Sequence, residues 1–164
     1  MKKLLFVFLL FGNVLNVLAQ DKIVLRDGTE LNVKVLESKE NVVVFTYPNE
    51  DIKNEKPKSM IDYILYASGR REEGMKIPTI ESKDDWEKVI LTTDKNAVIG
   101  LNKIKYLSVS GGSLWVTRET AHKSAEEKIR KKAAKLGCGI VLVTEDKYTG
   151  KSNEFCHISG ECYK

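Results

Sequence analysis

One segment of this chain repeats small apolar residues at the spacing of an α-helix. They recur every three or four positions, at Ala121, Ala125, Ile129, Ala133 and Leu136. This spacing places them on one helical face, and Gly137 suits the left-handed position that follows a helix. Because alanine lets a helix backbone approach a sheet closely, we expect a helix packed on a sheet, followed by a buried strand over residues 140–143.

The first half of the chain has the pattern of short β-strands. Leu31, Val33 and Val35 alternate with polar neighbours, the period of a half-buried strand. Asp27-Gly28 is a strong hairpin signal, because glycine accepts the positive φ that such a turn needs. Further strands are predicted over residues 42–47 and 60–66. The pattern therefore predicts a small β module over residues 20–68.

Two segments of this half resemble the small Sm-like and SH3-like β-barrels. They are residues 23–31, which contain the Asp27-Gly28 turn, and the closing strand over residues 61–64. The resemblance covers less than a third of the chain. It implies a barrel-like fold for this module and no activity, because such folds support many functions.

The charged segment over residues 69–79 is predicted to be a linker to a second module over residues 80–164. Near its start the second module has two alternative interpretations. Trp86 and the apolar residues 89–91 indicate a strand, whereas Ser82-x-x-Asp85 is typical of the cap of a short helix. We expect an α+β protein: a small all-β, barrel-like module, then an α/β module with one main helix on a sheet.

The N-terminus has the plan of a secretory signal peptide. Lys2 and Lys3 precede eight apolar residues, and Val17 and Ala19 occupy the −3 and −1 positions of a cut before Gln20. Crossing a membrane takes ~20 apolar residues, so no stable membrane span is expected. Residues 1–19 are thus predicted to be removed, which leaves a periplasmic or secreted protein.

The charge balance argues against a nucleic-acid partner. The chain has 27 basic and 23 acidic residues, a net charge of +4. Loss of Lys2 and Lys3 with the signal peptide lowers that charge to +2. Nucleic-acid-binding domains usually have a much larger basic surplus.

Three cysteines are the candidate cross-linking residues. In an oxidising compartment disulfides persist, and Cys156 and Cys162 enclose a Ser159-Gly160 segment that suits a small hairpin. A Cys156–Cys162 bridge is the first expectation, and Cys138 is the alternative partner of either. Zinc ligation by these cysteines and His157 is disfavoured, because structural zinc ligands usually come in pairs two to four residues apart. We expect one disulfide, no metal and no cofactor.

Residues 125–143 resemble the helix-to-strand unit of the Rcs-pathway stress-sensing lipoprotein family. The cysteine-bearing residues 155–162 are similar in kind to the tail of that family, with Cys156 and Cys162 near its last two cysteines. The resemblance covers about half of the mature chain and implies a small periplasmic α/β fold. This chain has no lipidation cysteine, and three domain cysteines where the family has four.

No catalytic motif is found in the sequence. The chain has no G-x-S-x-G, H-E-x-x-H or C-x-x-C. Gly150-Lys151-Ser152 follows acidic residues rather than the glycine of a phosphate-binding loop. We therefore expect a non-enzymatic envelope protein that interacts with another envelope protein, as a sensing or accessory module. One alternative is a carrier of a small ligand or metal that uses the cleft between the modules and the cysteine-bearing tail. The other is a hydrolase.

Overall fold

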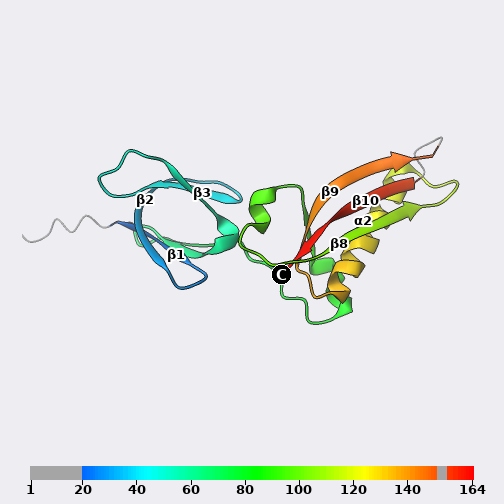
Figure 1. The fold of residues 1–164 in the computed structure, drawn as a ribbon, viewed down its shortest axis with the longest axis horizontal. Coiled ribbons are helices and arrows are strands. Elements are labelled where there is room, and N and C mark those ends of the chain that lie inside the picture. The colour runs from blue at the N-terminus through cyan, green and yellow to red at the C-terminus, as the bar shows by residue number, and fades with distance from the viewer. Residues whose placement is uncertain (1–19, 151–154) are drawn as a thin grey trace, which may run out of the picture.

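A computed structural model describes residues 20–150 and 155–164. In this part of the chain, two β-sheets and one long helix form an α+β structure that is mostly sheet (Figure 1). The coarse fold class predicted from the sequence is confirmed. The predicted signal peptide, residues 1–19, lies outside the described residues, as do Lys151 and Ser152.

Six short antiparallel strands form the first sheet, in the order β4-β3-β2-β1-β5-β6. Their bounds are β1 Asp21–Leu25, β2 Glu30–Ser38, β3 Val42–Thr46, β4 Asn54–Pro57, β5 Ile61–Leu65 and β6 Arg71–Glu73. The predicted turn joins β1 to β2. There Gly28 has a φ of +87°, and the Leu25 N–H donates to the Thr29 carbonyl at 2.8 Å.

The first sheet curves around its own apolar core. The fully buried members of this core include Ile23, Val33, Val43, Phe45, Ile61 and Ile64. The curvature brings distant strands together, because Glu72 of β6 accepts hydrogen bonds from Ser38 at the end of β2 and from Lys58, which follows β4. Side chains at the end of β2 and just after β4 therefore meet β6 at Glu72.

Part of the predicted linker is a strand. Within residues 69–79, Arg71–Glu73 form β6 and pair with β5, with Tyr63 opposite Glu73. The Arg71 guanidinium also lies over the Tyr63 ring, 3.6 Å from its centroid. An edge strand needs only one neighbour and tolerates charged side chains that face water. The linker prediction is wrong for these three residues, because a charged segment can form an edge strand whose side chains face water.

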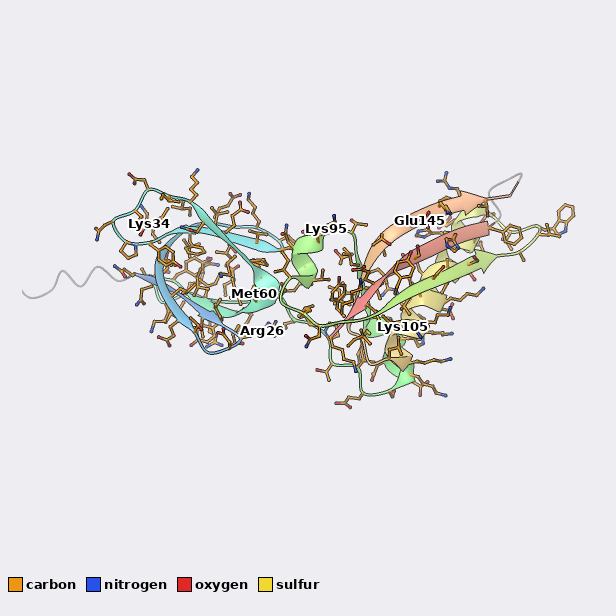
Figure 2. All side chains as sticks on the ribbon, viewed as in Figure 1. Arg26, Lys34, Met60, Lys95, Lys105 and Glu145 are labelled. Carbon is orange, nitrogen blue, oxygen red and sulfur yellow. The ribbon has the colours of Figure 1, made fainter. Side chains whose placement is uncertain are left out.

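The two sheets meet through short 3₁₀ helices. They are η1, Lys58–Met60, after the first sheet's β4, and η3, Lys95–Val98, before β8 of the second. The buried Ser59 hydroxyl donates to the Ile99 carbonyl oxygen at 2.6 Å. Figure 2 labels one residue of each helix. The buried Ser59 hydroxyl of η1, beside the first sheet, thus has its hydrogen-bond partner just after η3, beside the second sheet.

Four strands form the second sheet, in the order β7-β9-β10-β8. Their bounds are β7 Ile90–Thr92, β8 Lys103–Gly112, β9 Ile140–Thr149 and β10 Phe155–Tyr163. Strand β10 pairs antiparallel with both β8 and β9, and β7 pairs parallel with β9. The cysteine-bearing tail is therefore a central strand of this sheet.

The hairpin expected at Ser159-Gly160 is not formed. Both residues lie inside β10, where Gly160 pairs with Leu107 on one side and Val143 on the other. A Cβ atom on Gly160 would lie 2.3 Å from the carbonyl oxygen of Leu142. Glycine here permits close approach of the neighbouring strand beside a register shift, rather than a reversal of the chain.

The predicted helix is α2, Arg118–Lys135, which covers one face of the second sheet (Figure 1). The alanine stripe is confirmed as its packing surface, since Ala121, Ala125, Ile129 and Ala133 are fully buried. Opposite them, a Cβ atom on Gly111 would lie 2.3 Å from the Ala125 nitrogen. Gly137 has the predicted left-handed conformation, with a φ of +67°. No helix of the described residues is both long and apolar enough to cross a membrane.

The region around Trp86 contains both predicted alternatives in sequence, a short helix and then strand β7, which begins at Ile90. This 3₁₀ helix, η2, spans Lys83–Lys88. The Ser82 hydroxyl accepts the Asp84 N–H, and the Asp85 carboxylate accepts the Ser82 N–H, both at 3.1 Å. These two bonds satisfy amide groups that the first turn leaves free.

Candidate functional site

Cys156 and Cys162 lie on the helix-facing side of β10, six residues apart. Cys156 pairs with Gly111 and Tyr148, and Cys162 pairs with Lys105 and Val141. A strand rises about 3.3 Å per residue, so these two cysteines are about 20 Å apart. A disulfide requires Cα atoms within about 7 Å. The first expected bridge, Cys156–Cys162, therefore does not fit this strand, and its premise of a hairpin is wrong.

Cys138 and Cys162 form a buried pair of thiols. Cys138 follows α2, and its Sγ lies 2.7 Å from the Sγ of Cys162, with both residues fully buried. Burial, followed by the contact with Cys162, raises the pKa of the Cys138 thiol to about 12. Both cysteines are free thiols in the structure. The alternative partner named from the sequence is thus the one that lies beside Cys162.

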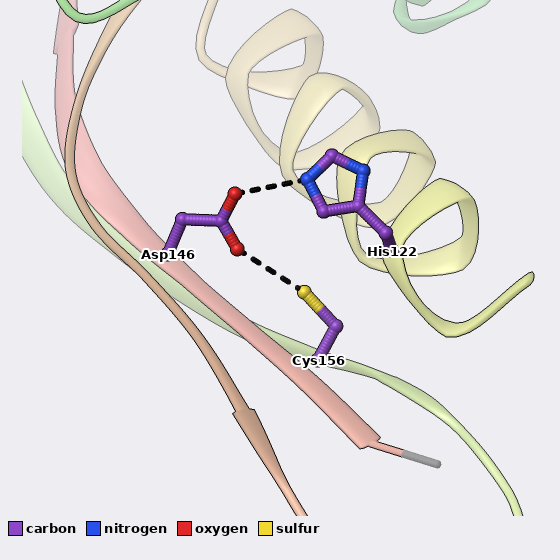
Figure 3. A group of neighbouring side chains, drawn as sticks. All are labelled: His122, Asp146 and Cys156. Atoms are coloured by element: carbon purple, nitrogen blue, oxygen red, sulfur yellow. Dashed lines mark hydrogen bonds and ion pairs between the residues drawn. The ribbon is translucent and has the colours of Figure 1, made fainter. Parts of the chain in front are cut away.

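Cys156 belongs to a second group, with His122 and Asp146 (Figure 3). His122 is on the first turns of α2, Asp146 on β9 and Cys156 at the start of β10. One Asp146 carboxylate oxygen lies 2.9 Å from His122 Nε2, and the other accepts from the Cys156 thiol at 3.4 Å. The carboxylate therefore lies between the imidazole and the thiol.

This group is poorly suited to nucleophilic catalysis. Burial, followed by the hydrogen bond to Asp146, raises the pKa of the Cys156 thiol to about 12. A reactive cysteine needs a lowered pKa, usually from a neighbouring imidazolium or a helix N-terminus. Here the Cys156 thiol contacts the Asp146 carboxylate rather than the His122 imidazole, so it stays protonated at neutral pH and reacts slowly.

Further side chains fix the position of His122. Its ring stacks on Tyr148 with the centroids 6.1 Å apart, and the Arg118 guanidinium lies 4.0 Å from the centroid of the Tyr148 ring. Glu126 lies one helical turn after His122, with an oxygen 4.0 Å from His122 Nδ1. The imidazole is therefore held between an aromatic ring and two carboxylates.

A pocket of about 380 Å³ opens onto this group. It is lined by Leu91, Thr92, Thr93, His122, Glu126, Val143, Asp146 and Ile158. The pocket lies on the second sheet, whereas the alternative of a ligand carrier placed its cleft between the two modules. A small solute can reach His122 and Asp146 through it, while Cys156 lies behind them in the core.

The four ligands considered in the sequence do not converge. His157 neighbours Cys156 on β10, so its side chain lies on the opposite face of the sheet. There its two ring nitrogens contact the hydroxyls of Ser108 and Ser110, at 3.2 and 3.1 Å. Neither contact is a carboxylate that would orient the ring as a catalytic base.

The sequence alone does not predict the group that His122, Asp146 and Cys156 form, since these residues lie far apart along the chain. The one local signal is the spacing of His122 and Glu126, which share a helical face. The rest depends on the pairing of β9 with β10, which places Asp146 opposite Ile158 and Tyr148 opposite Cys156.

The loop between β8 and α2 exposes two large apolar side chains. Trp115 is 99% exposed and Leu114 is 66% exposed. Trp115 also has a φ of +75°, a backbone conformation that is strained for a bulky residue. Both flanking elements hold this loop, since β8 ends at Gly112 and the Thr117 side chain caps α2 by accepting the Thr120 N–H.

Comparisons with protein-family models, with curated proteins and with solved structures found no match to this chain.

Proposed function

We propose that this protein is exported to the periplasm or beyond and acts there by binding another envelope protein, without catalysing a reaction. The signal-peptide pattern of residues 1–19 supports export. The high pKa of the Cys156 thiol argues against its use as a nucleophile. His157 contacts two serine hydroxyls rather than a carboxylate, which argues against its use as a catalytic base. Binding is the function that these features favour.

The observation that supports binding most strongly is the exposed loop tip at Leu114 and Trp115. A tryptophan buries roughly 150–250 Å² when it is covered, and Trp115 leaves almost all of its surface in water. Tryptophan is among the residues most enriched at the energetic centres of protein interfaces. The loop therefore supplies an anchor for an apolar pocket on a partner.

The loop is also placed to act as an anchor. Its ends belong to a ten-residue strand and an 18-residue helix. A binding loop on a rigid scaffold loses less conformational entropy when it binds. The adjacent Arg118, at the first position of α2, adds a positive charge at the rim of the proposed contact.

We also propose that the chain has two modules, a barrel-like one that includes β1 to β6 and an α/β one that includes β7 to β10. The separate apolar cores of the two sheets support this division. The resemblances to Sm-like or SH3-like barrels and to the Rcs-pathway lipoprotein family agree with it. The binding loop belongs to the second module.

Site-specific cross-linking tests the proposed interaction. A photo-reactive amino acid replaces Trp115 in one protein and Tyr106, a half-exposed aromatic on β8 of the same sheet, in a matched control. Irradiation of cells that export each protein is expected to join position 115, but not position 106, to one defined envelope protein. Competition by the unlabelled wild-type chain, but not by Trp115→Ser, is expected to remove the adduct.

Two results would contradict the proposed interaction. The same adducts from positions 106 and 115 would show collision without a specific surface. Adducts of position 115 with lipid alone would assign the loop to a membrane surface, where tryptophan is also enriched.

A further inference from the structure

We propose that His122, Asp146 and Cys156 form a binding site for one zinc ion. The site is separate from the proposed partner-binding loop and depends on different residues.

The three side chains already lie nearly as close together as zinc requires. One nitrogen, one oxygen and one sulfur ligand atom all lie within 4.8 Å of one another. Ligands of a tetrahedral zinc ion, at roughly 2.0–2.3 Å from the metal, are about 3.3–3.8 Å apart. The Asp146 carboxylate already lies 2.9 Å from His122 Nε2 and 3.4 Å from Cys156 Sγ, so closing the widest gap takes a movement of about 1 Å.

The donor atoms favour zinc over calcium or magnesium. Imidazole and thiolate are borderline and soft ligands, whereas calcium and magnesium take oxygen ligands. On binding, the Cys156 S–H bond breaks, its proton passes to solvent, and the thiolate and the Asp146 carboxylate together offset the charge of Zn²⁺. The metal replaces the two hydrogen bonds that Asp146 now makes (Figure 3).

The surroundings of His122 complete the arrangement typical of zinc sites. A zinc-binding histidine usually donates its second ring N–H to a carboxylate or carbonyl oxygen, which fixes the ring. A Glu126 oxygen lies 4.0 Å from His122 Nδ1 while Nε2 faces Asp146, so a small movement of the Glu126 side chain would let it accept a hydrogen bond from Nδ1. The pocket beside the group leaves a fourth coordination position for water or a small ligand.

No other group of three such side chains is found among residues 20–150 and 155–164. Cys138 and Cys162 form a pair, but no third ligand joins them there. His157 lies on the opposite face of the sheet, where its ring nitrogens contact serine hydroxyls. We therefore expect one zinc site per chain, with Cys156 as its single sulfur ligand.

Metal titration of the tag-free, full-length mature chain tests this site. Zinc is added to metal-stripped protein, and bound metal and affinity are measured. We expect one zinc per chain, with the affinity lowered more than about 100-fold in His122→Gln and Cys156→Ser and about 10-fold in Glu126→Gln, since outer-shell partners usually contribute 10–100-fold. His157→Gln is the matched control, because His157 is the other histidine of the chain, and it is expected to bind zinc as wild type does.

Cobalt substitution adds a second readout. The cobalt-loaded wild-type protein is expected to show a thiolate-to-cobalt charge-transfer band, and Cys156→Ser is expected to lose it. If Cys156→Ser does not fold, Asp146→Asn tests the site at an exposed ligand. The absence of zinc binding to folded wild type, or a cobalt band that survives in Cys156→Ser, would overturn the proposal. Trp115→Ser is expected to bind zinc normally, so failure of the interaction and failure of the metal site are distinguishable.

Discussion

Glu72 shows how one side chain joins distant parts of the first sheet. Its carboxylate accepts hydrogen bonds from Lys58 and Tyr66, each at 2.8 Å, and from Ser38. Burial alone would raise the pKa of Glu72, but the bonds from Lys58, Ser38 and Tyr66 outweigh it and lower the pKa to about 2. The ionised carboxylate therefore stabilises the folded sheet.

Replacing Glu72 is expected to make stability less sensitive to acid. The folded-state pKa lies below the unfolded value, so the stabilisation by Glu72 is present above pH 4.5 and is lost as the pH falls toward 2. Glu72→Gln is expected to lower the free energy of unfolding by about 1–2 kcal/mol at pH 7, with a smaller loss at pH 3. Urea unfolding at both pH values measures the difference.

Glu55→Gln serves as the control, because Glu55 is an exposed residue of β4. It is expected to leave stability nearly unchanged at both pH values. An equal loss for Glu72→Gln at pH 7 and pH 3 would contradict the assigned role of the Glu72 carboxylate.

At the scale of elements, the contact of α2 with β8 depends on the absence of a side chain. Gly111 faces the helix, where its backbone lies against the buried Ala121 and Ala125. An added Cβ atom would lie 2.4 Å from the Ala121 carbonyl oxygen and 2.3 Å from the Ala125 nitrogen. Both neighbours are backbone atoms, so the helix itself must shift to make room.

Gly111→Ala is therefore expected to lower the free energy of unfolding by roughly 1–3 kcal/mol, the usual cost of overpacking a core. Chemical denaturation measures the change. Lys105→Ala, at an exposed position of the same strand, is the control and is expected to stay within about 0.5 kcal/mol of wild type. A stability of Gly111→Ala equal to that of the control would show that α2 does not pack as closely as described.

Local signals explain which elements could be predicted. The alanine stripe and Gly137 lie within one short segment of the sequence, so α2 and the residue at which it ends were predictable. Strand β10 was not, because its Cys, His, Ser and Gly residues give no strand pattern and its place depends on pairing with both β8 and β9. The group at His122, Asp146 and Cys156 was missed for the same reason, since strand register and helix packing bring its members together.

At the scale of the whole molecule, the two sheets have separate apolar cores and meet through η1 and η3. A third small cluster, which includes Ala97, Val98, Ile140 and Leu142, covers the face of β9 that α2 does not. The segment after β6 contributes Met75 and Ile77 to this cluster. Part of the segment that connects the two sheets, at Met75 and Ile77, therefore packs against the second sheet.

Export determines the chemical state of the cysteines in this account. In an oxidising compartment the neighbouring Cys138 and Cys162 are expected to form a disulfide, which would stabilise the fold by roughly 2–4 kcal/mol. Cys156 would keep its thiol, as the proposed zinc site requires. In a reducing compartment all three thiols would persist.

The most direct test of the account is the intact mass of the chain recovered from fractionated cells. We predict that the exported fraction contains a chain that begins at Gln20 and is lighter by two hydrogens than its fully reduced form. Peptide mapping of the same sample is expected to assign the bridge to Cys138 and Cys162. A full-length chain in the cytosol with three free thiols would contradict the account.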